Sequence, residues 1–410
     1  MPHSNSEWAL LFAIAVPITA CDPPDSNGAA EYTGVEPAFA AQGPSSPALV
    51  EEGRMIFRFE TFGDETFWTD TLRMHEVIRT SVSPTTALAV GLKVDVDALP
   101  AAVRAGILDG TIDLDAPATT VVLLGLGAVV GVIGQVDAAN TLTQVGITCA
   151  LCHSTVDDSL VPGIGSRLDG WPNRDLNVGA IVALSPALSA AQRAVYDSWG
   201  PGMYDPRFNL DGQNLPVVLP PAFGLRHVSR ETYTGDDVVS YWNEYVAITQ
   251  MHGHGHFVDA RIGVDVNNPP DLVSSKLEPL RAYQFSLERP EPVPGDFAPE
   301  AARRGRAVFN GVARCADCHL GEALTDVGAD RLHSAAEVGQ DPTYALRSVT
   351  KLYRTTPLRG LWHPPQLVGP YFHDGSAATL EAVVDHYVQL FDLGLTAQHK
   401  ADLVEYLKTL

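Results

Sequence analysis

The chain has 410 residues, of which 27 are Lys or Arg and 49 are Asp or Glu, so its formal net charge is −22. Nucleic-acid binding is not expected, because proteins that bind nucleic acid present a basic face to the phosphates. An anionic membrane surface is a poor partner for the same reason. Apolar residues make up 45% and charged residues 19% of the chain, which permits a buried core and excludes global disorder.

The N-terminus carries an apolar run, Trp8–Ala20, that ends at Cys21. This run is too short to span a bilayer and has the length of a signal-peptide core. We therefore expect residues 1–21 to be a signal peptide, with lipid attachment at Cys21 or, alternatively, ordinary secretory cleavage nearby. Residues 22–48 are rich in Pro, Ser, Gly and Ala and are expected to form a flexible tether. The predicted location is periplasmic or exported, with membrane contact only through an N-terminal lipid.

Four of the five cysteines belong to two Cys-x-x-Cys-His motifs, the pattern of covalent haem attachment. In this pattern two thiols add to the vinyl groups of a haem, and the histidine that follows is the proximal iron ligand. A zinc site built from the four thiolates would leave both histidines unexplained. We therefore expect two c-type haems. The residues that would hold them are Cys149, Cys152 and His153 in the first motif and Cys315, Cys318 and His319 in the second.

The second motif lies between two segments with helical periodicity. Residues 298–310 are expected to form a helix in which Gly305 permits close approach of another helix, and residues 396–410 carry an apolar stripe at helical spacing. A first helix, a haem motif and a last helix that crosses the first describe a cytochrome c fold. We expect a mainly α protein with two cytochrome c-like haem domains, an N-terminal extension and long ordered loops. The expected boundaries are 49–294 for the extension with the first haem domain and 295–410 for the second.

Three strings in the C-terminal part are similar to a known family: TTPLRG at 355–360, GPYFHDGS at 369–376 and TLEAVVDHY at 379–387. They resemble the second haem domain of the bacterial di-haem cytochrome c peroxidase and MauG superfamily. The resemblance is strong over 298–410, weaker over 147–250 and absent before. It implies that one haem stores or relays electrons while the other reacts with peroxide or oxygen.

The resemblance also bears on the distal ligand of the second haem. The peroxidases of the family place a Met there and MauG a Tyr; in this sequence the position is Tyr387, and residues 295–410 contain no Met. Tyr387 and His386 are therefore the candidate iron ligands, followed by His373 and His363. A phenolate or a second imidazole would give a lower haem potential than a Met. The other role implied for His373, from its counterpart in the family, is a place near the haem or at the surface between the domains.

The first haem is predicted to be open on its distal side. Residues 238–242 (VVSYW) weakly repeat residues 383–387 (VVDHY). This register places Trp242 where the second domain has Tyr387. Because an indole cannot ligate iron, the first haem is predicted to be the reactive one.

The segment MHGHGH at 251–256 offers competing roles. Met251 or His252 would be a distal ligand of the first haem. The three histidines of this segment fall on one face of an extended chain, a spacing that suits copper or zinc. A cluster of solvent-facing or hydrogen-bonded histidines is the remaining alternative.

Other polar and aromatic residues complete the candidate site. Arg167 and Arg174 are expected to pair with haem propionates, and the alternative for both is an ordinary surface salt bridge. The family's peroxidases place a Trp between the haems and a Gln and a Glu where the O–O bond is cleaved, but that spacing is not found here. Trp171, Trp199 and Trp362 are the candidates for the bridge, and the alternative for each is a place in the core. The candidate acid–base groups are His227, Glu231 and Glu244.

The favoured function is the reduction of hydrogen peroxide by an exported di-haem cytochrome. Electrons from a small periplasmic donor, a cytochrome c or a cupredoxin, would pass from the C-terminal haem to the N-terminal haem. One alternative is a MauG-like or rubber-oxygenase-like oxidase that uses peroxide or oxygen against an organic or protein substrate. Another is a di-haem electron carrier without catalytic activity. The resemblance also permits calcium between the domains.

Overall fold

The computed structural model describes residues 45–362 and 369–410. The predicted signal peptide with Cys21, most of the predicted tether, and His363 lie outside these residues. None of the helices in the described ranges combines the length and the apolar composition needed to cross a membrane.

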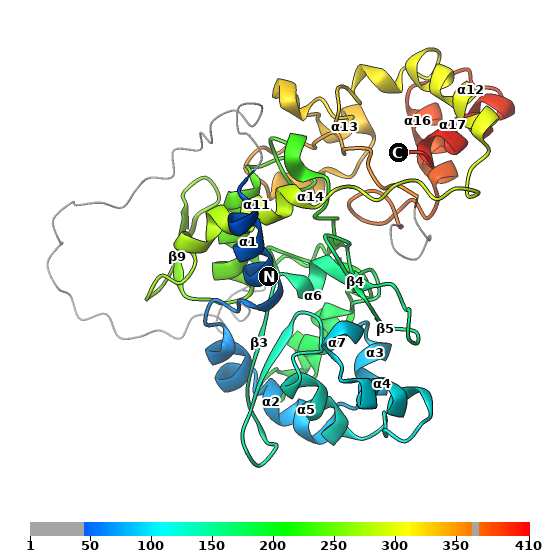
Figure 1. Cartoon of the computed structure of the whole chain (residues 1–410). Helices are drawn as coiled ribbons and strands as arrows, with labels where there is room; N and C mark the ends of the chain where they lie inside the picture. Colours follow the sequence, from blue (N-terminus) through cyan, green and yellow to red (C-terminus); the bar gives the residue numbers. More distant parts are fainter. Residues whose placement is uncertain (1–44, 363–368) are drawn as a thin grey trace, which may run out of the picture.

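Helices form most of the regular structure (Figure 1), in agreement with the predicted mainly α fold. In chain order they are α1 (Pro47–Phe59), α2 (Met74–Ser81), α3 (Pro84–Ala89), α4 (Ala101–Leu108), α5 (Pro117–Gly125), α6 (Ala150–His153), α7 (Val178–Ala183), α8 (Ala190–Asp197), α9 (Phe208–Asp211), α10 (Val239–Tyr245), α11 (Leu277–Ser286), α12 (Pro299–Asn310), α13 (Ala335–Val338), α14 (Pro342–Leu346), α16 (Leu380–Leu390) and α17 (Ala397–Leu407).

The strands are short, and within the described ranges they form five two-stranded sheets. One sheet is parallel and pairs β1 (Val94–Asp95) with β5 (Ile164–Gly165). The antiparallel pairs are β2 (Val132–Val136) with β3 (Leu142–Ile147), β4 (Ser154–Val156) with β6 (Arg167–Asp169), β7 (Met203–Tyr204) with β8 (Val217–Val218), and β9 (Gly255–Asp259) with β10 (Val264–Asn268). Helices and loops therefore form most of the architecture, and the strands form only short pairings.

Two pairs of helices cross at a glycine. α12 packs across α17, as the sequence predicted, and a Cβ atom on Gly305 would lie 1.9 Å from the carbonyl oxygen of Asp402. α1 packs across α11 in the same way, because a Cβ atom on Gly53 would lie 1.9 Å from the carbonyl oxygen of Pro279. Phe309, which is fully buried, fills the α12–α17 crossing. Only a residue without a side chain lets two helix backbones approach so closely, so each crossing depends on one glycine.

The N-terminal extension, for which the sequence offered no signature, forms a layer of helices over a hairpin. α2 packs against α5 and β3, and α5 packs against β2; these elements make up the lower part of Figure 1. Leu123 and Leu124 of α5 are buried in its core together with Leu142 and Val145 of β3. Because β3 leads directly to Cys149, this layer positions the first motif.

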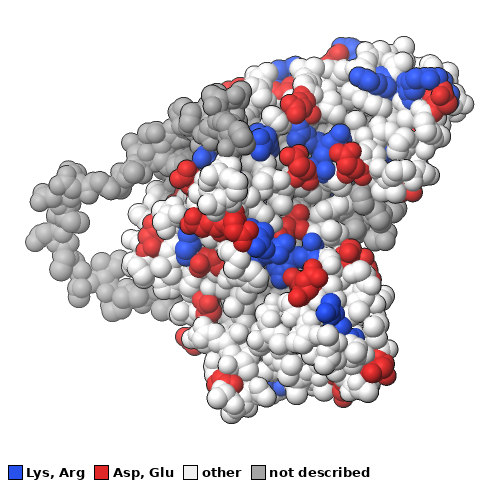
Figure 2. Space-filling model, in the orientation of Figure 1, with Lys and Arg blue, Asp and Glu red and all other residues white. Residues whose placement is uncertain are grey.

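Charged side chains on the face seen in Figure 2 gather on its middle and upper parts, whereas the lower part around α2–α5 is largely uncharged. Acidic and basic groups are interspersed in the middle and upper parts (Figure 2). The net charge of −22 is therefore not concentrated in one patch on this face.

A network of buried ion pairs joins the C-terminal part of the chain to the segment before α10. The Arg347 side chain is 2% exposed, and it donates to Asp205 at 3.0 Å and to Asp211 at 2.7 Å. Arg207, which pairs with the buried Asp236, also donates to the carbonyl oxygen of Arg347 at 2.7 Å. The network therefore fixes two regions that lie far apart in the sequence.

The substitution Arg347→Met is expected to lower the free energy of unfolding by about 3 kcal/mol, because it leaves the fully buried carboxylate of Asp205 without its cation. Urea unfolding followed by circular dichroism measures this change. Arg303→Met is the matched control: the ion pair of Arg303 with Glu300 is exposed, and exposed pairs contribute little. Equal effects of the two substitutions would contradict a structural role for the network.

Candidate haem sites

The first Cys-x-x-Cys-His motif forms a single helical turn, α6, between β3 and β4. The His153 N–H donates to the carbonyl oxygen of Cys149 at 3.2 Å, so the two thiols and the imidazole come from one turn. The four described cysteines are free. Burial raises the pKa of Cys149 and of Cys152 to about 12, so both are neutral thiols. A pair of free thiols on one turn is what addition to haem vinyl groups requires.

The histidine of each motif is oriented by a backbone carbonyl group. His153 Nδ1 lies 3.1 Å from the carbonyl oxygen of Pro220, and His319 Nδ1 lies 2.9 Å from that of Leu324. A carbonyl oxygen can only accept, so Nδ1 carries the proton in both rings and Nε2 keeps its lone pair. Burial lowers the pKa of His153 to about 4 and also lowers that of His319, so both rings are neutral. This is the state in which histidine ligates iron.

A cavity of about 430 Å³ opens beside the first motif, and Cys149, Cys152 and His153 line it. Its walls are mostly apolar and come from the extension, from α7 and α10, and from the C-terminal part of the chain, which contributes Tyr371 and Phe372. Cofactor sites share this character of an apolar hollow with a few placed polar groups.

Arginine side chains in the wall of this cavity have buried N–H groups without hydrogen-bond partners among the described residues. Nε and Nη1 of Arg174 and Nε of Arg354 are buried and have no hydrogen-bond partner among the described residues, and both side chains line the cavity, as does that of Arg359. Buried donors without a partner are costly, and the carboxylates of haem propionates would satisfy them. The residues present therefore fit a covalently attached haem, and Arg174 has the surroundings expected of a propionate partner.

Arg167, the other predicted propionate partner, lies away from the cavity. Its Nε donates to Asp95 at 2.9 Å, and its guanidinium lies over the ring of Phe59 at 5.5 Å from the centroid. The structure thus gives Arg167 a buried salt bridge rather than a surface one, and its buried Nη1 has no hydrogen-bond partner among the described residues.

Met251 and His252 both line the cavity, just after the π-helical turn Val246–Gln250. Met251 is buried. The His252 backbone is left-handed, with φ of 66°, and its ring stacks on Phe67 at 3.7 Å between centroids. Burial lowers the pKa of His252 to about 4, so the ring is neutral. The cavity wall therefore contains both residues that were predicted as alternative ligands of the first iron, together with Trp242.

The three histidines of residues 251–256 do not converge. His254 Nδ1 lies 3.2 Å from the carbonyl oxygen of Pro269, and the exposed His256 pairs with Asp265 at 3.0 Å. Only His252 of the three lines the cavity. The copper or zinc alternative therefore lacks the convergence that a metal site needs.

The second motif begins with the 3-10 turn η8 (Cys315–Asp317), and α16 brings Tyr387 close to it. Burial and then the nearby thiols of Cys318 and Cys315 raise the pKa of Tyr387 to about 12. His386, next along α16, has its Nε2 2.9 Å from the carbonyl oxygen of Val338. Of the two candidate ligands, Tyr387 thus has a pKa that the thiols help to raise, whereas His386 Nε2 is held by a backbone carbonyl group.

Comparisons with known proteins were made for the whole chain. No family model matches it. It is 35% identical over 127 residues to the methylamine utilization protein MauG of Methylorubrum extorquens, a match that covers 27% of this chain and 34% of the relative. A second MauG, from Methylophilus methylotrophus, is 33% identical over 96 residues, covering 22% of this chain and 27% of the relative. Over these residues the chain is similar to MauG.

The predicted resemblance to the di-haem cytochrome c peroxidase and MauG superfamily is thereby confirmed for the matched part of the chain. The chain is also 31% identical over 170 residues to hydrazine synthase subunit gamma of Kuenenia stuttgartiensis, covering 32% of this chain and 46% of that subunit. A solved structure of Kuenenia stuttgartiensis hydrazine synthase gives a TM-score of 0.31 at 21% identity, over 48% of this chain and 72% of the solved chain. The matches span less than half of each curated relative.

Three of the predicted site residues, Trp171, His227 and Glu244, do not line the cavity. Trp171 is buried edge-on against Phe223, which does line it, with centroids 5.5 Å apart. His227 is exposed and faces Glu322 at 3.4 Å. Glu244 is half-buried on α10, and burial raises its pKa to about 7. Trp171 lies outside the cavity lining but next to the first motif, because the Gly170 and Asn173 N–H groups donate to the carbonyl oxygens of His153 and Cys152 at 2.8 and 2.9 Å.

Glu231 is the carboxylate among the acid–base candidates that reaches the cavity. Its Oε2 accepts from Arg354 at 3.1 Å, and its buried Oε1 has no partner among the residues described. Burial raises the pKa of Glu231, although Arg354 opposes the shift. The wall of the cavity beside the first motif therefore contains a buried carboxyl group.

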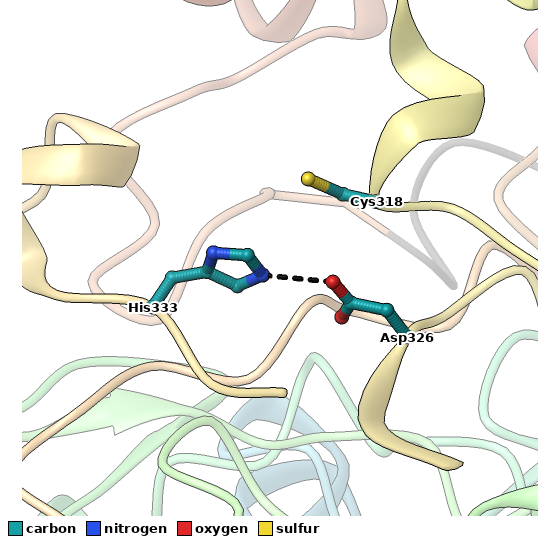
Figure 3. A group of neighbouring side chains, drawn as sticks. All are labelled: Cys318, Asp326 and His333. Carbon is teal, nitrogen blue, oxygen red and sulfur yellow. Dashed lines mark hydrogen bonds and ion pairs between the residues drawn. The ribbon is translucent and has the colours of Figure 1, made fainter. Parts of the chain in front are cut away.

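A second cluster of polar groups lies beside the second motif. Figure 3 shows Cys318, Asp326 and His333, whose ligand atoms lie within 4.8 Å of one another. His333 Nε2 is 3.0 Å from Asp326, and its Nδ1 is 2.8 Å from Glu337. Calcium takes six to eight oxygen ligands, which this mixed set does not offer, so calcium stays a prediction. In a haem-loaded chain the Cys318 sulfur is bonded to haem, and Asp326 and His333 become neighbours of that bond.

His373, which the sequence placed near a haem or between domains, is buried and outside the cavity lining. Its Nε2 lies 3.3 Å from the hydroxyl of Tyr353, and its backbone carbonyl oxygen accepts from the Val218 N–H at 2.8 Å. His373 therefore connects the GPYFHDGS string to β8, a strand whose residues line the first cavity.

Proposed function

We propose that this chain is an exported oxidoreductase with two covalent c-type haems that reduces hydrogen peroxide at its N-terminal haem with electrons relayed by its C-terminal haem. The observation that carries the proposal is the asymmetry between the two motifs. The first opens on a cavity of about 430 Å³ with unpaired polar groups in its wall, whereas the second packs in one hydrophobic cluster with α16, the helix that carries Tyr387.

The residues of the cavity have distinct tasks under this proposal. When bound, the haem supplies the iron at which the O–O bond breaks. Arg174, Arg354 and Arg359 hold its propionates. The neutral ring of His252 takes the proton from incoming peroxide, and Glu231, whose pKa burial raises, protonates the departing oxygen. Each peroxide takes up two electrons and two protons and leaves as two waters.

The electron donor under this proposal is a small periplasmic protein, a cytochrome c or a cupredoxin. Exposed apolar side chains on both sides of the second motif support its docking there: Val312 is 60% exposed and Leu320 is 41% exposed. A donor that covered these side chains would approach the second haem rather than the first. Electrons would then enter through the second haem.

A second candidate is a MauG-like or rubber-oxygenase-like oxidase that acts on an organic or protein substrate. Tyr387 beside the second motif favours it, because a tyrosine ligand keeps the haem potential low, and two of the relatives are named MauG. Steady-state turnover of peroxide with a reduced small cytochrome c separates the two candidates. Sustained turnover supports the peroxidase, and a single turnover without donor oxidation supports the oxidase.

Low-temperature EPR of the oxidised, haem-loaded protein, with and without cyanide, tests the proposed division of labour. We expect a high-spin signal from one haem that cyanide converts to low-spin. Two low-spin signals indifferent to cyanide would contradict the proposal and indicate an electron carrier, with Met251 or His252 on the first iron.

The substitution His252→Gln is expected to slow the reaction with peroxide by about 100-fold, because the cavity loses its neutral base. Stopped-flow absorbance measures the rate, and EPR of the resting protein should stay high-spin. His254→Gln is the matched control, since His254 lies outside the cavity lining. A high-spin signal that arises only in the His252 variant would show instead that His252 ligates the iron.

A further inference from the structure

Tyr353 and His373 form a buried pair between the two haem sites. Their side chains are 5% and 6% exposed, their ring centroids lie 5.0 Å apart, and the Tyr353 hydroxyl is 3.3 Å from His373 Nε2. Two more tyrosines surround the imidazole: the ring of Tyr344 lies 5.5 Å from it and that of Tyr233 lies 6.2 Å from it. A single buried histidine is thus enclosed by phenols.

The pair touches the surroundings of both haems. On one side, Tyr344 and Tyr233 line the cavity of the first motif. On the other, the Tyr353 backbone exchanges hydrogen bonds of 2.7 and 2.8 Å with the backbone of His333. His333 belongs to the group that includes Cys318, the thiol of the second motif (Figure 3). A continuous set of packed and hydrogen-bonded groups therefore runs from one motif to the other.

A second contact, between the rings of Phe372 and Tyr387, also leads from the first cavity toward the second motif. Phe372, the neighbour of His373 in the sequence, lines the first cavity, and its ring lies 6.1 Å from that of Tyr387. Tyr387 belongs to α16, whose buried Leu380 and Val384 pack in one hydrophobic cluster with Cys315 of the second motif. The aromatic groups around His373 therefore approach the second motif by two routes.

We infer that Tyr353 and His373 form a proton-coupled redox relay between the two haem sites, an inference that rests on the proposed function. After peroxide has oxidised the first haem site, Tyr353 gives it one electron and passes the phenolic proton to His373 Nε2. Tyr353 would then take one electron from the reduced second haem and its proton back from His373. The net result is one electron moved from the second haem to the first, with Tyr353 and His373 unchanged.

The geometry provides for the proton as well as for the electron. The Tyr353 hydroxyl rests 2.6 Å from the carbonyl oxygen of Asp341, which can accept a hydrogen bond but cannot hold a proton. His373 Nε2, which lies 3.3 Å from the same hydroxyl, is an imidazole nitrogen and can hold it. Rotation of one O–H bond thus connects the donor to its base.

The relay is tested in the haem-loaded protein with Tyr353→Phe and His373→Gln. Stopped-flow spectroscopy follows oxidation of the reduced second haem after peroxide is added, and freeze-quench EPR detects a tyrosyl radical, identified by incorporation of deuterated tyrosine. Both substitutions should slow oxidation of the second haem by about tenfold or more and remove the tyrosyl signal. Haem content and the reaction of the first haem with peroxide should be unchanged.

Tyr245→Phe is the matched control. Tyr245 is a fully buried tyrosine outside the cavity lining, and its hydroxyl also donates to a backbone carbonyl group, that of Pro206 at 2.7 Å. If Tyr353→Phe and His373→Gln match Tyr245→Phe in rate and radical yield, the relay is overturned while the proposed function stands. If the wild-type protein shows no oxidation of the second haem by peroxide, both fall together.

Discussion

Replacement of Cys149 and Cys152 together by serine is expected to halve the covalent haem content of the chain and to abolish its reaction with peroxide. The first haem would lose both thioether bonds, and the apolar cavity beside α6 would lose the group for which its buried arginines are arranged. The pyridine haemochrome assay and intact-protein mass measure the haem content. EPR of the variant should lack the high-spin signal and keep that of the second haem.

The paired variant Cys315→Ser with Cys318→Ser is the control for haem loss as such. It should also carry one haem, but its first haem should still react once with peroxide and still respond to cyanide. Multiple turnovers with an external donor should be lost, because electrons would no longer enter through the second site. If the second pair rather than the first abolished the reaction with peroxide, the proposed direction of electron flow would be reversed.

The substitution Gly305→Val is expected to lower the free energy of unfolding by about 3 kcal/mol or more, because overpacking at this position cannot be absorbed by a flexible side chain. A Cβ atom there would lie 1.9 Å from a backbone carbonyl oxygen of α17, so α12 and α17 would have to separate. The helix propensity of valine exceeds that of glycine, so a loss of stability would report the crossing itself. Thermal unfolding measures the loss.

Gly394→Val is the matched control for Gly305→Val. A Cβ atom on Gly394 meets nothing within 4 Å, so this substitution should leave the stability nearly unchanged. Gly53→Val should resemble Gly305→Val, since its Cβ atom would also lie 1.9 Å from a backbone oxygen. Equal stability of the Gly305 and Gly394 variants would show that the crossing can widen without cost.

The parts of the site that the sequence revealed are those whose chemistry depends on residues close together in the chain. The two Cys-x-x-Cys-His motifs are single turns, and Gly305 stands in an obvious helical pattern. Arg174 could be predicted as a propionate partner because it follows the first motif closely in the sequence. The last helix was predicted correctly for the same reason, since its apolar stripe is local and periodic.

The parts that the sequence did not reveal depend on long-range pairing. Arg354 pairs with Glu231 in the cavity wall although the two are 123 residues apart in the sequence. Arg347 pairs with Asp205, which is 142 residues away in the sequence. Neither contact has a spacing that a reader of the chain could recognise. The crossing of α1 and α11 at Gly53 has the same geometry as the crossing of α12 and α17 at Gly305. The long segment between α1 and α11 makes this similarity hard to recognise in the sequence.

The two histidines that would hold iron differ in where their carbonyl partners come from. His319 is oriented by Leu324, five residues later, whereas His153 is oriented by Pro220, 67 residues later. Closing a longer loop costs more conformational entropy. We therefore expect the histidine of the second motif to be oriented as soon as a short turn forms, and that of the first motif only after the chain has folded back on itself. The order in which the two motifs reach their final geometry is then set by loop length and not by their order in the sequence.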